Sequence, residues 1–258
     1  MALPDMHGSL MVALMALASR LALLAVGIVS DALFPDYDSS AELHTDSCDA
    51  VSNTDHTAWF SSAVRSSVVW DSVYFERLAR CGYEFEHFFA FFPGLPALMQ
   101  RFSAAQGFPW TQIAGFAVSV ASFVLAAVLL YRCAHCTAGI FQTIIRQRLC
   151  LANRHDAGLT SLATSASRIG VRVTRDPQLS AVATILLCIS PASVFLTYSY
   201  TESLFLLCTL AGVWVVAEDL PPLLAAAPFA ASCAVRSNGA ISGPAARLRR
   251  SLSMLSHL

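Results

Sequence analysis

Five apolar segments follow one another along the chain, separated by polar stretches of unequal length. They cover residues 9–30, 111–131, 179–197, 203–217 and 223–235. A bilayer-spanning helix needs about 20 apolar residues, so the first two segments are long enough and the last two are short. The pattern predicts an all-α membrane protein, with residues 1–258 forming a single domain built as a multi-span helical bundle.

The first apolar segment holds one charged residue, Arg20, near its centre. A guanidinium at that depth is costly unless it reaches the interface or finds a partner. A cleaved signal peptide is the alternative to a retained helix here. The N-terminal region holds Asp5 and no arginine or lysine, and the apolar stretch is long for a signal peptide. We therefore favour the retained helix.

A polar loop over residues 31–69 leads to a short region with helical periodicity. Its apolar positions recur at helical spacing, at Trp70, Tyr74, Leu78 and Cys81. Its charged residues fall on other faces, at Glu76, Arg77 and Arg80. This predicts an amphipathic helix that ends at Gly82 and lies along the membrane surface. The apolar run 88–99 is short and broken by prolines, which predicts a re-entrant or interfacial segment.

Only 13% of the residues are charged, against about 25% in soluble domains. Residues 31–110 contain eleven acids and four arginines, whereas residues 132–178 contain seven arginines and two aspartates. Because basic loops stay in the cytoplasm, we expect 132–178 to be cytoplasmic, with a short interfacial stretch at 138–152. We expect 31–110 to be a large lumenal loop. Five spans from a cytosolic N-terminus also place 198–202 and the region after 235 on the lumenal side.

Asp71, beside Trp70, is the first candidate for chemistry. A carboxylate at a membrane boundary is costly to desolvate, so it usually has a partner or a function. Asp71 can act as a general base if it reaches an attacking hydroxyl, and the alternative is a solvated acid at a helix start. Glu86 and His87 stand in a dense aromatic run, where they can order a sugar or form a polar boundary.

Two further polar groups follow apolar segments. Pro191 frees a backbone carbonyl near the end of the third segment, and the polar residues beyond it, up to Glu202, can satisfy that carbonyl or contact a ligand. A helix-capping role for Thr201 is the alternative there. Arg236, with Asn238 close by, suits a phosphate, and the alternative is an arginine that snorkels at a helix end.

The cysteines and histidines indicate no metal site. The stretch 133–136 has the spacing of half a zinc site, and the other half is missing. We therefore expect no metal and no cofactor, and no nucleic acid partner. Cys48 and Cys81 fall in the expected lumenal loop, and the sequence leaves open whether they pair.

Five short blocks together resemble one family, the GPI mannosyltransferase 2 enzymes. The blocks are WDSVYF at 70–75, GYEFEHFFAFFPG at 82–94, SPASVF at 190–195, YTES at 200–203 and RSNG at 236–239. They occur in the family's order and cover roughly residues 65–245. Members of the family are much longer and have more spans, so the chain resembles a C-terminally truncated or reduced member.

The resemblance implies a multi-pass enzyme of the endoplasmic reticulum membrane, with the GT-C type of fold. It implies an α-1,6-mannosyltransferase that adds the second mannose of the GPI-anchor precursor, a glycolipid, from dolichyl phosphate mannose. A small accessory membrane subunit is a further expected partner. Asp71 occupies the position of the catalytic acid in the first lumenal loop. Trp70, Glu86, His87, Glu202, Arg236 and Asn238 are the expected substrate-binding residues.

Two other functions compete with this interpretation. A non-catalytic membrane subunit, or an inactive fragment of such an enzyme, is the main alternative. A small transporter or channel would need polar residues within several spans, and only Arg20 qualifies.

Overall fold

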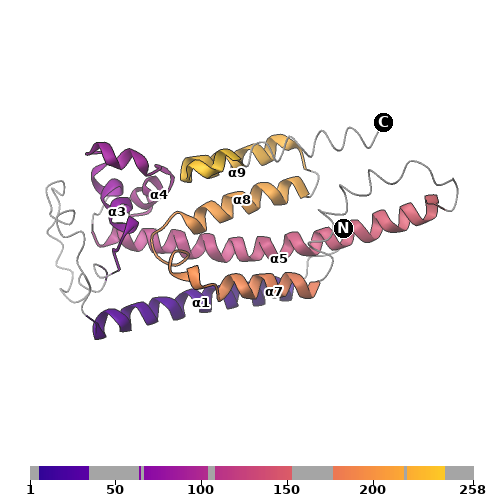
Figure 1. The fold of residues 1–258 in the computed structure, drawn as a ribbon, viewed down its shortest axis with the longest axis horizontal. Helices are drawn as coiled ribbons and strands as arrows, with labels where there is room; N and C mark the ends of the chain where they lie inside the picture. The colour runs from indigo at the N-terminus through magenta and orange to yellow at the C-terminus, as the bar shows by residue number, and fades with distance from the viewer. Residues whose placement is uncertain are drawn as a thin grey trace.

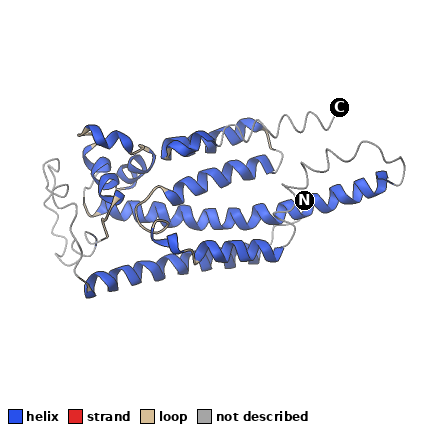
Figure 2. Ribbon diagram, viewed as in Figure 1, coloured by secondary structure: helices blue, strands red, loops and turns tan. Residues whose placement is uncertain are grey.

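The computed structural model describes residues 6–34, 64, 67–103, 108–152, 177–217 and 220–241. Within these ranges the regular structure is helical, without strands (Figure 2). The α-helices are α1 (Met6–Leu33), α3 (Asp71–Cys81), α4 (Gly94–Phe102), α5 (Trp110–Ala152), α7 (Pro177–Cys188), α8 (Glu202–Ala217) and α9 (Pro222–Val235). Short 3-10 helices are η2 (Glu86–Ala90), η3 (Pro191–Val194) and η4 (Ser237–Ile241). The all-α prediction is confirmed for this part of the chain.

The long helix α5 runs through the middle of the molecule (Figure 1). Helices α1 and α7 pack against it and against each other, whereas α8 packs on α5, and α9 on α8. Helices α3 and α4 lie at the end of the bundle where α5 and α8 begin and α9 ends. The three regions that we expect on the lumenal side are 31–110, 198–202 and the region after 235. Their described parts therefore lie together at one end of the helical bundle.

Two helices are long and apolar enough to cross a membrane, α1 over Met6–Ser30 and α5 over Trp110–Arg132. Helices α8 and α9 contain shorter apolar stretches, and their bounds agree with the fourth and fifth predicted segments. Gly212 lets these two helices approach closely, because a Cβ there would lie 2.4 Å from the Phe229 ring. Small residues serve this purpose where helices pack in membranes.

The second predicted segment is longer than expected. Helix α5 continues without a break to Ala152, so residues 138–152 belong to the same helix as the second predicted segment, and their position at the membrane interface stays a prediction. The sequence after Arg132 contains no proline up to Ala152 and one glycine, Gly139. A single glycine costs about 1 kcal/mol relative to alanine and does not by itself end a helix.

The third predicted segment is shorter than expected, since α7 ends at Cys188 and not at residue 197. The cause is Pro191, which disfavours helical backbone at the residue before it. Ser190 is accordingly non-helical (φ −55°, ψ 139°), and its Oγ accepts a hydrogen bond from the Ala192 amide at 3.3 Å. The chain then turns through η3 and an irregular stretch before α8 begins.

Helix α3 has the predicted ends, but its charged faces are not exposed as an amphipathic surface helix requires. Seven of its residues are buried, among them Glu76 and Arg77. Both α4 and α5 pack against α3, and they cover faces that the periodicity assigned to solvent. An amphipathic helix with a polar face open to solvent is therefore not what the structure shows at Glu76 and Arg77, and the position of α3 along the membrane surface stays a prediction.

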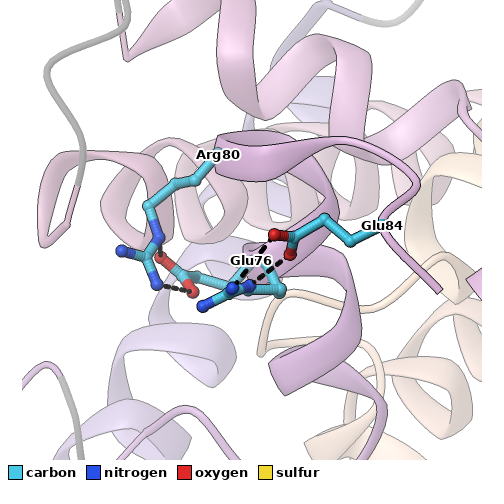
Figure 3. A network of polar contacts seen from close by, with 4 residues as sticks. Glu76, Arg80 and Glu84 are labelled. Atoms are coloured by element: carbon cyan, nitrogen blue, oxygen red, sulfur yellow. Dashed lines mark hydrogen bonds and ion pairs between the residues drawn. The ribbon is translucent and has the colours of Figure 1, made fainter. Parts of the chain in front are cut away.

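Two ion pairs make this burial tolerable (Figure 3). Arg80 Nε lies 2.6 Å from Glu76 Oε1, and these side chains are 4% and 2% exposed. Arg77 Nε donates to Glu84 Oε2 at 2.7 Å and so ties the loop after Gly82 back to α3. A buried charge is stable in a protein when it is paired and hydrogen-bonded.

We predict that Glu76→Gln destabilises the protein strongly, because it leaves the Arg80 guanidinium buried beside a neutral group. The expected loss is about 3–5 kcal/mol of unfolding free energy, the cost of removing one partner of a buried ion pair. Thermal unfolding in detergent measures it. Glu86→Gln is the matched control, since Glu86 is exposed and the change there should cost less than about 0.5 kcal/mol. Equal stability of the two variants would contradict the prediction.

Candidate functional site

Helix α3 begins at a strained residue. Trp70, immediately before it, has φ 55° and ψ −130°, a positive φ that bulky residues rarely adopt. Such backbone conformations persist only where the surroundings hold them, and they cluster at functional sites. The conformation leaves the Trp70 side chain 68% exposed at the end of the bundle.

Asp71 is the first residue of α3, and it is exposed. Its carboxylate makes no hydrogen bond or ion pair with any of the described residues. A negative charge in the first turn of a helix is favourable, so the ionised form is suited to this position. Asp71 is therefore an accessible carboxylate whose oxygens are available to a ligand.

Tyr200, between η3 and α8, supports the strained turn. Its buried phenol donates a hydrogen bond to the Val69 carbonyl at 3.0 Å. Its ring lies 5.3 Å from that of Phe195, which in turn lies 6.1 Å from the Trp70 ring. Burial raises the pKa of Tyr200 above its ordinary range, and the negative charges of Asp71 and Glu202 raise it further. Both carboxylates thus act on the same phenol.

A second contact fixes the start of α3 to α5. Gln112 Nε2 donates to Ser72 Oγ at 3.1 Å, and neither residue is exposed to solvent. Ser199 Oγ donates to the Gln112 carbonyl at 3.4 Å, so the segment before α8 reaches the same point. Reasoning from the sequence missed Ser72, Gln112 and Tyr200 as supports. Only Tyr200 carried a signal, since it stands in the polar block before α8.

Glu202 and Arg236 form an ion pair with Nη1 and Oε1 2.5 Å apart. Glu202 is the first residue of α8 and Arg236 follows the last residue of α9. Their side chains are 31% and 38% exposed, so the pair faces partly into solvent. Two residues predicted separately as substrate-binding are therefore joined to each other.

Gly239 explains how the chain turns after Arg236. A Cβ at this position would lie 2.4 Å from the backbone nitrogen of Cys233, so only glycine lets η4 fold back on α9. The Gly239 amide donates to the Arg236 carbonyl at 3.0 Å, which closes the turn. Asn238 is exposed here and makes no hydrogen bond with the described residues.

His87 and Glu86 lie on η2, beside α3. The His87 ring meets Tyr74 edge-on at 6.0 Å and stacks on Phe85 at 5.7 Å. Tyr74 is one helical turn beyond Asp71 and stacks on Phe91 at 4.7 Å. Glu86 is exposed and makes no ion pair with the described residues. The aromatic run thus forms a wall against α3.

An apolar groove of about 670 Å³ lies beside this site, between α4, α5 and α8. Its lining includes Phe102, Trp110, Ile113, Leu125 and Leu204. Leu204 lies in the first turn of α8 and Trp110 begins α5, so the groove extends from the end of the bundle that holds α3 and α4 along α5 to Leu125. A groove of this composition suits an apolar chain.

The described residues contain no group of three or more histidine, cysteine or acidic side chains that could hold a metal. The expected half-site at 133–136 lies in the part of α5 whose side chains fall outside the description. Cys81 is disulfide-bonded, and Cys48 lies outside the described residues.

Comparison with known proteins identifies the family. The profile of the family described as Mannosyltransferase (PIG-V) matches residues 10–163 and 159–250. GPI mannosyltransferase 2 of Chaetomium globosum is 32% identical over 191 residues, which are 67% of this chain and 36% of that protein. GPI alpha-1,6-mannosyltransferase 2 of Homo sapiens is 31% identical over 182 residues, which are 67% of this chain and 29% of that protein. The mouse protein of the same name is 30% identical over 177 residues.

The chain spans about a third of the length of these relatives. No solved structure matches it significantly. The matched residues include α3 with Asp71, the block before α8, and Arg236 after α9. The family resemblance of the sequence blocks is thereby confirmed, and the chain belongs to the mannosyltransferase (PIG-V) family.

Proposed function

We propose that this chain carries the reaction centre of a GPI α-1,6-mannosyltransferase, which transfers the second mannose of the GPI precursor from dolichyl phosphate mannose. The observation that carries the proposal is that Asp71 is exposed and without an ion-pair partner among the described residues. It stands at a strained helix start, which the phenol of Tyr200 supports through the Val69 carbonyl, and Tyr200 comes two residues before Glu202, the partner of Arg236.

Asp71 serves as the general base. Its ionised carboxylate accepts the proton of the acceptor mannose hydroxyl while that oxygen attacks the anomeric carbon of the donor. The bond from that carbon to the phosphate oxygen breaks, and the electron pair leaves with the dolichyl phosphate. The configuration at the anomeric carbon inverts, because attack and departure take place on opposite faces.

Arg236 binds the phosphate of the donor. Its guanidinium has five N–H donors, and the ion pair with Glu202 engages Nη1, so other donors remain for phosphate oxygens. The charge that develops on the leaving phosphate is stabilised by such a fixed donor. Glu202 then orients Arg236, which refines the expectation that Glu202 binds substrate directly.

The exposed ring of Trp70 and the wall around His87 contact the sugars. Trp70 adjoins Asp71 and presents an exposed aromatic face, which suits the apolar face of a pyranose. Glu86 and Asn238 are exposed polar residues, and they serve as hydrogen-bonding partners of sugar hydroxyls. No metal and no cofactor take part in this scheme.

The apolar groove receives the isoprenoid chain of the donor; Leu204, in the first turn of α8, lines the groove, and Glu202, the partner of Arg236, begins the same helix. We place the chain in the endoplasmic reticulum membrane as a multi-pass bundle of the GT-C type, with the site end lumenal. The disulfide at Cys81 supports this side, because disulfides persist in oxidising compartments. A small accessory membrane subunit stays a prediction.

We predict that Asp71→Asn abolishes transfer and leaves the fold intact. Loss of a general base costs about 100-fold or more in rate, and the exposed side chain has no structural partner among the described residues to lose. The assay expresses the chain in cells without GPI α-1,6-mannosyltransferase 2 and scores surface GPI-anchored protein. Rescue by the unmodified chain but not by Asp71→Asn, at equal abundance in the membrane, supports the proposal.

Two outcomes contradict it. Full rescue by Asp71→Asn means that this carboxylate is not the base. Failure of the unmodified chain, although it is abundant in the membrane, assigns it a non-catalytic role. Asp71→Glu keeps the charge and moves it by one methylene, so it should retain part of the rescue that Asp71→Asn loses.

We predict that Arg236→Gln lowers transfer about 100-fold, because the leaving phosphate loses its positive partner. Arg101→Gln is the matched control, since it removes an exposed arginine on α4, at the same end of the bundle. Its rate should stay within about twofold, as for surface changes away from a site. Equal losses in the two variants would show that general electrostatic attraction, and not this arginine, holds the donor.

A further inference from the structure

Arg20 lies in the middle of α1 and is fully buried. Nη2 donates to the Cys188 carbonyl at 2.7 Å and to Ser193 Oγ at 3.1 Å. Nη1 donates to the Ser193 carbonyl at 3.0 Å and to Thr197 Oγ1 at 3.2 Å. The guanidinium carbon lies 4.1 Å from the centre of the Phe123 ring of α5, a cation–π contact. Both terminal nitrogens therefore donate to groups 168–177 residues away in the chain, and Nε donates to the neighbouring Ser19 Oγ at 3.3 Å.

These partners belong to one segment, the end of α7 and the turns that follow it. The break at Pro191 removes the helical hydrogen bond that the Cys188 carbonyl would otherwise accept. The Ser193 carbonyl accepts from the Leu196 amide at 3.2 Å and from Thr197 Oγ1 at 2.7 Å, in addition to Arg20. Arg20 thus fixes the path of the segment 189–200, and α1 lies beside it in Figure 1.

The same segment supports the start of α3 from its other side. Phe195 contacts the Trp70 ring at 6.1 Å, and Tyr200 donates to the Val69 carbonyl. Ser203 Oγ donates to the Leu196 carbonyl at 2.8 Å, which ties the segment to the first turn of α8. A displacement of the segment would therefore move both the strained turn before Asp71 and the helix start that carries Glu202.

We propose that Arg20 is a positioning residue: it holds the segment 189–200, from which Phe195 and Tyr200 set the backbone of Trp70 and Asp71. The effect of Arg20 on mannose transfer rests on the proposed function. Its effect on the geometry of Trp70 does not, so an experiment can refute either effect without refuting the other.

A purely structural role for Arg20 in holding α1 to the bundle is the competing explanation, and Arg132 provides the matched control. Arg132 Nε donates to Ser9 Oγ at 3.3 Å, so it also joins α1 to α5. It follows Phe123, the α5 residue that Arg20 contacts, by more than two helical turns, and its partner Ser9 precedes Arg20 by about three turns in α1. Arg20→Gln and Arg132→Gln each remove one guanidinium from this helix pair.

The test is fluorine NMR of the full chain, purified in detergent and labelled with 5-fluorotryptophan. The chain has four tryptophans, and Trp70→Phe identifies the Trp70 signal by its loss. We expect Arg20→Gln to shift or split the Trp70 signal and to leave that of Trp214 in place, while Arg132→Gln changes neither. An unchanged Trp70 signal in folded Arg20→Gln, or an equal change in Arg132→Gln, overturns the proposal.

Thr197→Val decides the question if Arg20→Gln does not fold. This substitution keeps the charge of Arg20 and the shape of residue 197, and it removes one acceptor of Arg20 together with the hydrogen bond from Thr197 Oγ1 to the Ser193 carbonyl, so a smaller shift of the Trp70 signal is expected. An unchanged signal overturns the proposal.

Transfer assays in the complemented cell membranes give the second readout. A displaced base lowers kcat, about 100-fold for a misplacement near 1 Å, and leaves KM for the donor unchanged. A rise in KM with constant kcat overturns the positioning role in catalysis. A shifted Trp70 signal in a chain without any transfer activity supports the positioning of Trp70 and refutes the proposed function.

Discussion

The buried guanidinium of Arg20 is the interaction on which the arrangement of the site end depends. A cation in an apolar bundle is tolerated only if its donors are satisfied, and broken helices in such surroundings leave carbonyls that must also be satisfied. In this chain the same hydrogen bonds satisfy the cation and the carbonyls, because the carbonyls of Cys188 and Ser193 accept from Arg20. The helix break at Pro191 and the charge in α1 therefore stabilise each other.

The charges of α3 differ in function according to whether they lie in ion pairs. Glu76, Arg77 and Arg80 lie in ion pairs within or beside the helix. Asp71 has no such partner among the described residues, although it stands on the same helix. A carboxylate that is already paired must break its ion pair to accept a proton from a substrate, whereas Asp71 has no ion pair with a described residue to break. Its position and its lack of a partner together favour it as the base.

Hydrophobic segmentation predicted the helices whose sequences are largely apolar, α1, α8 and α9, because burial in lipid or in the bundle requires little more than an apolar sequence. It failed to predict helix ends where a single residue decides whether the helix continues. Pro191 ended α7 early, and the absence of a proline after Arg132 let α5 continue. The burial of Glu76 was not predictable from periodicity, because α4 and α5 cover α3 through contacts distant in sequence. The spacing of Glu76 and Arg80, four residues apart, was the available signal for their pair.

Candidate site residues were found by their residue type and position, but their connections were not. Nothing in the sequence joins Glu202 to Arg236, 34 residues later, since that pair depends on how α8 packs on α9. The part of Tyr200 depends likewise on the close approach of two distant segments. Burial and the nearby carboxylates raise the pKa of Tyr200 above its ordinary range, so its phenol remains a hydrogen-bond donor near neutral pH. The hydrogen bond from Tyr200 to the Val69 carbonyl therefore holds the strained turn before Asp71 in place.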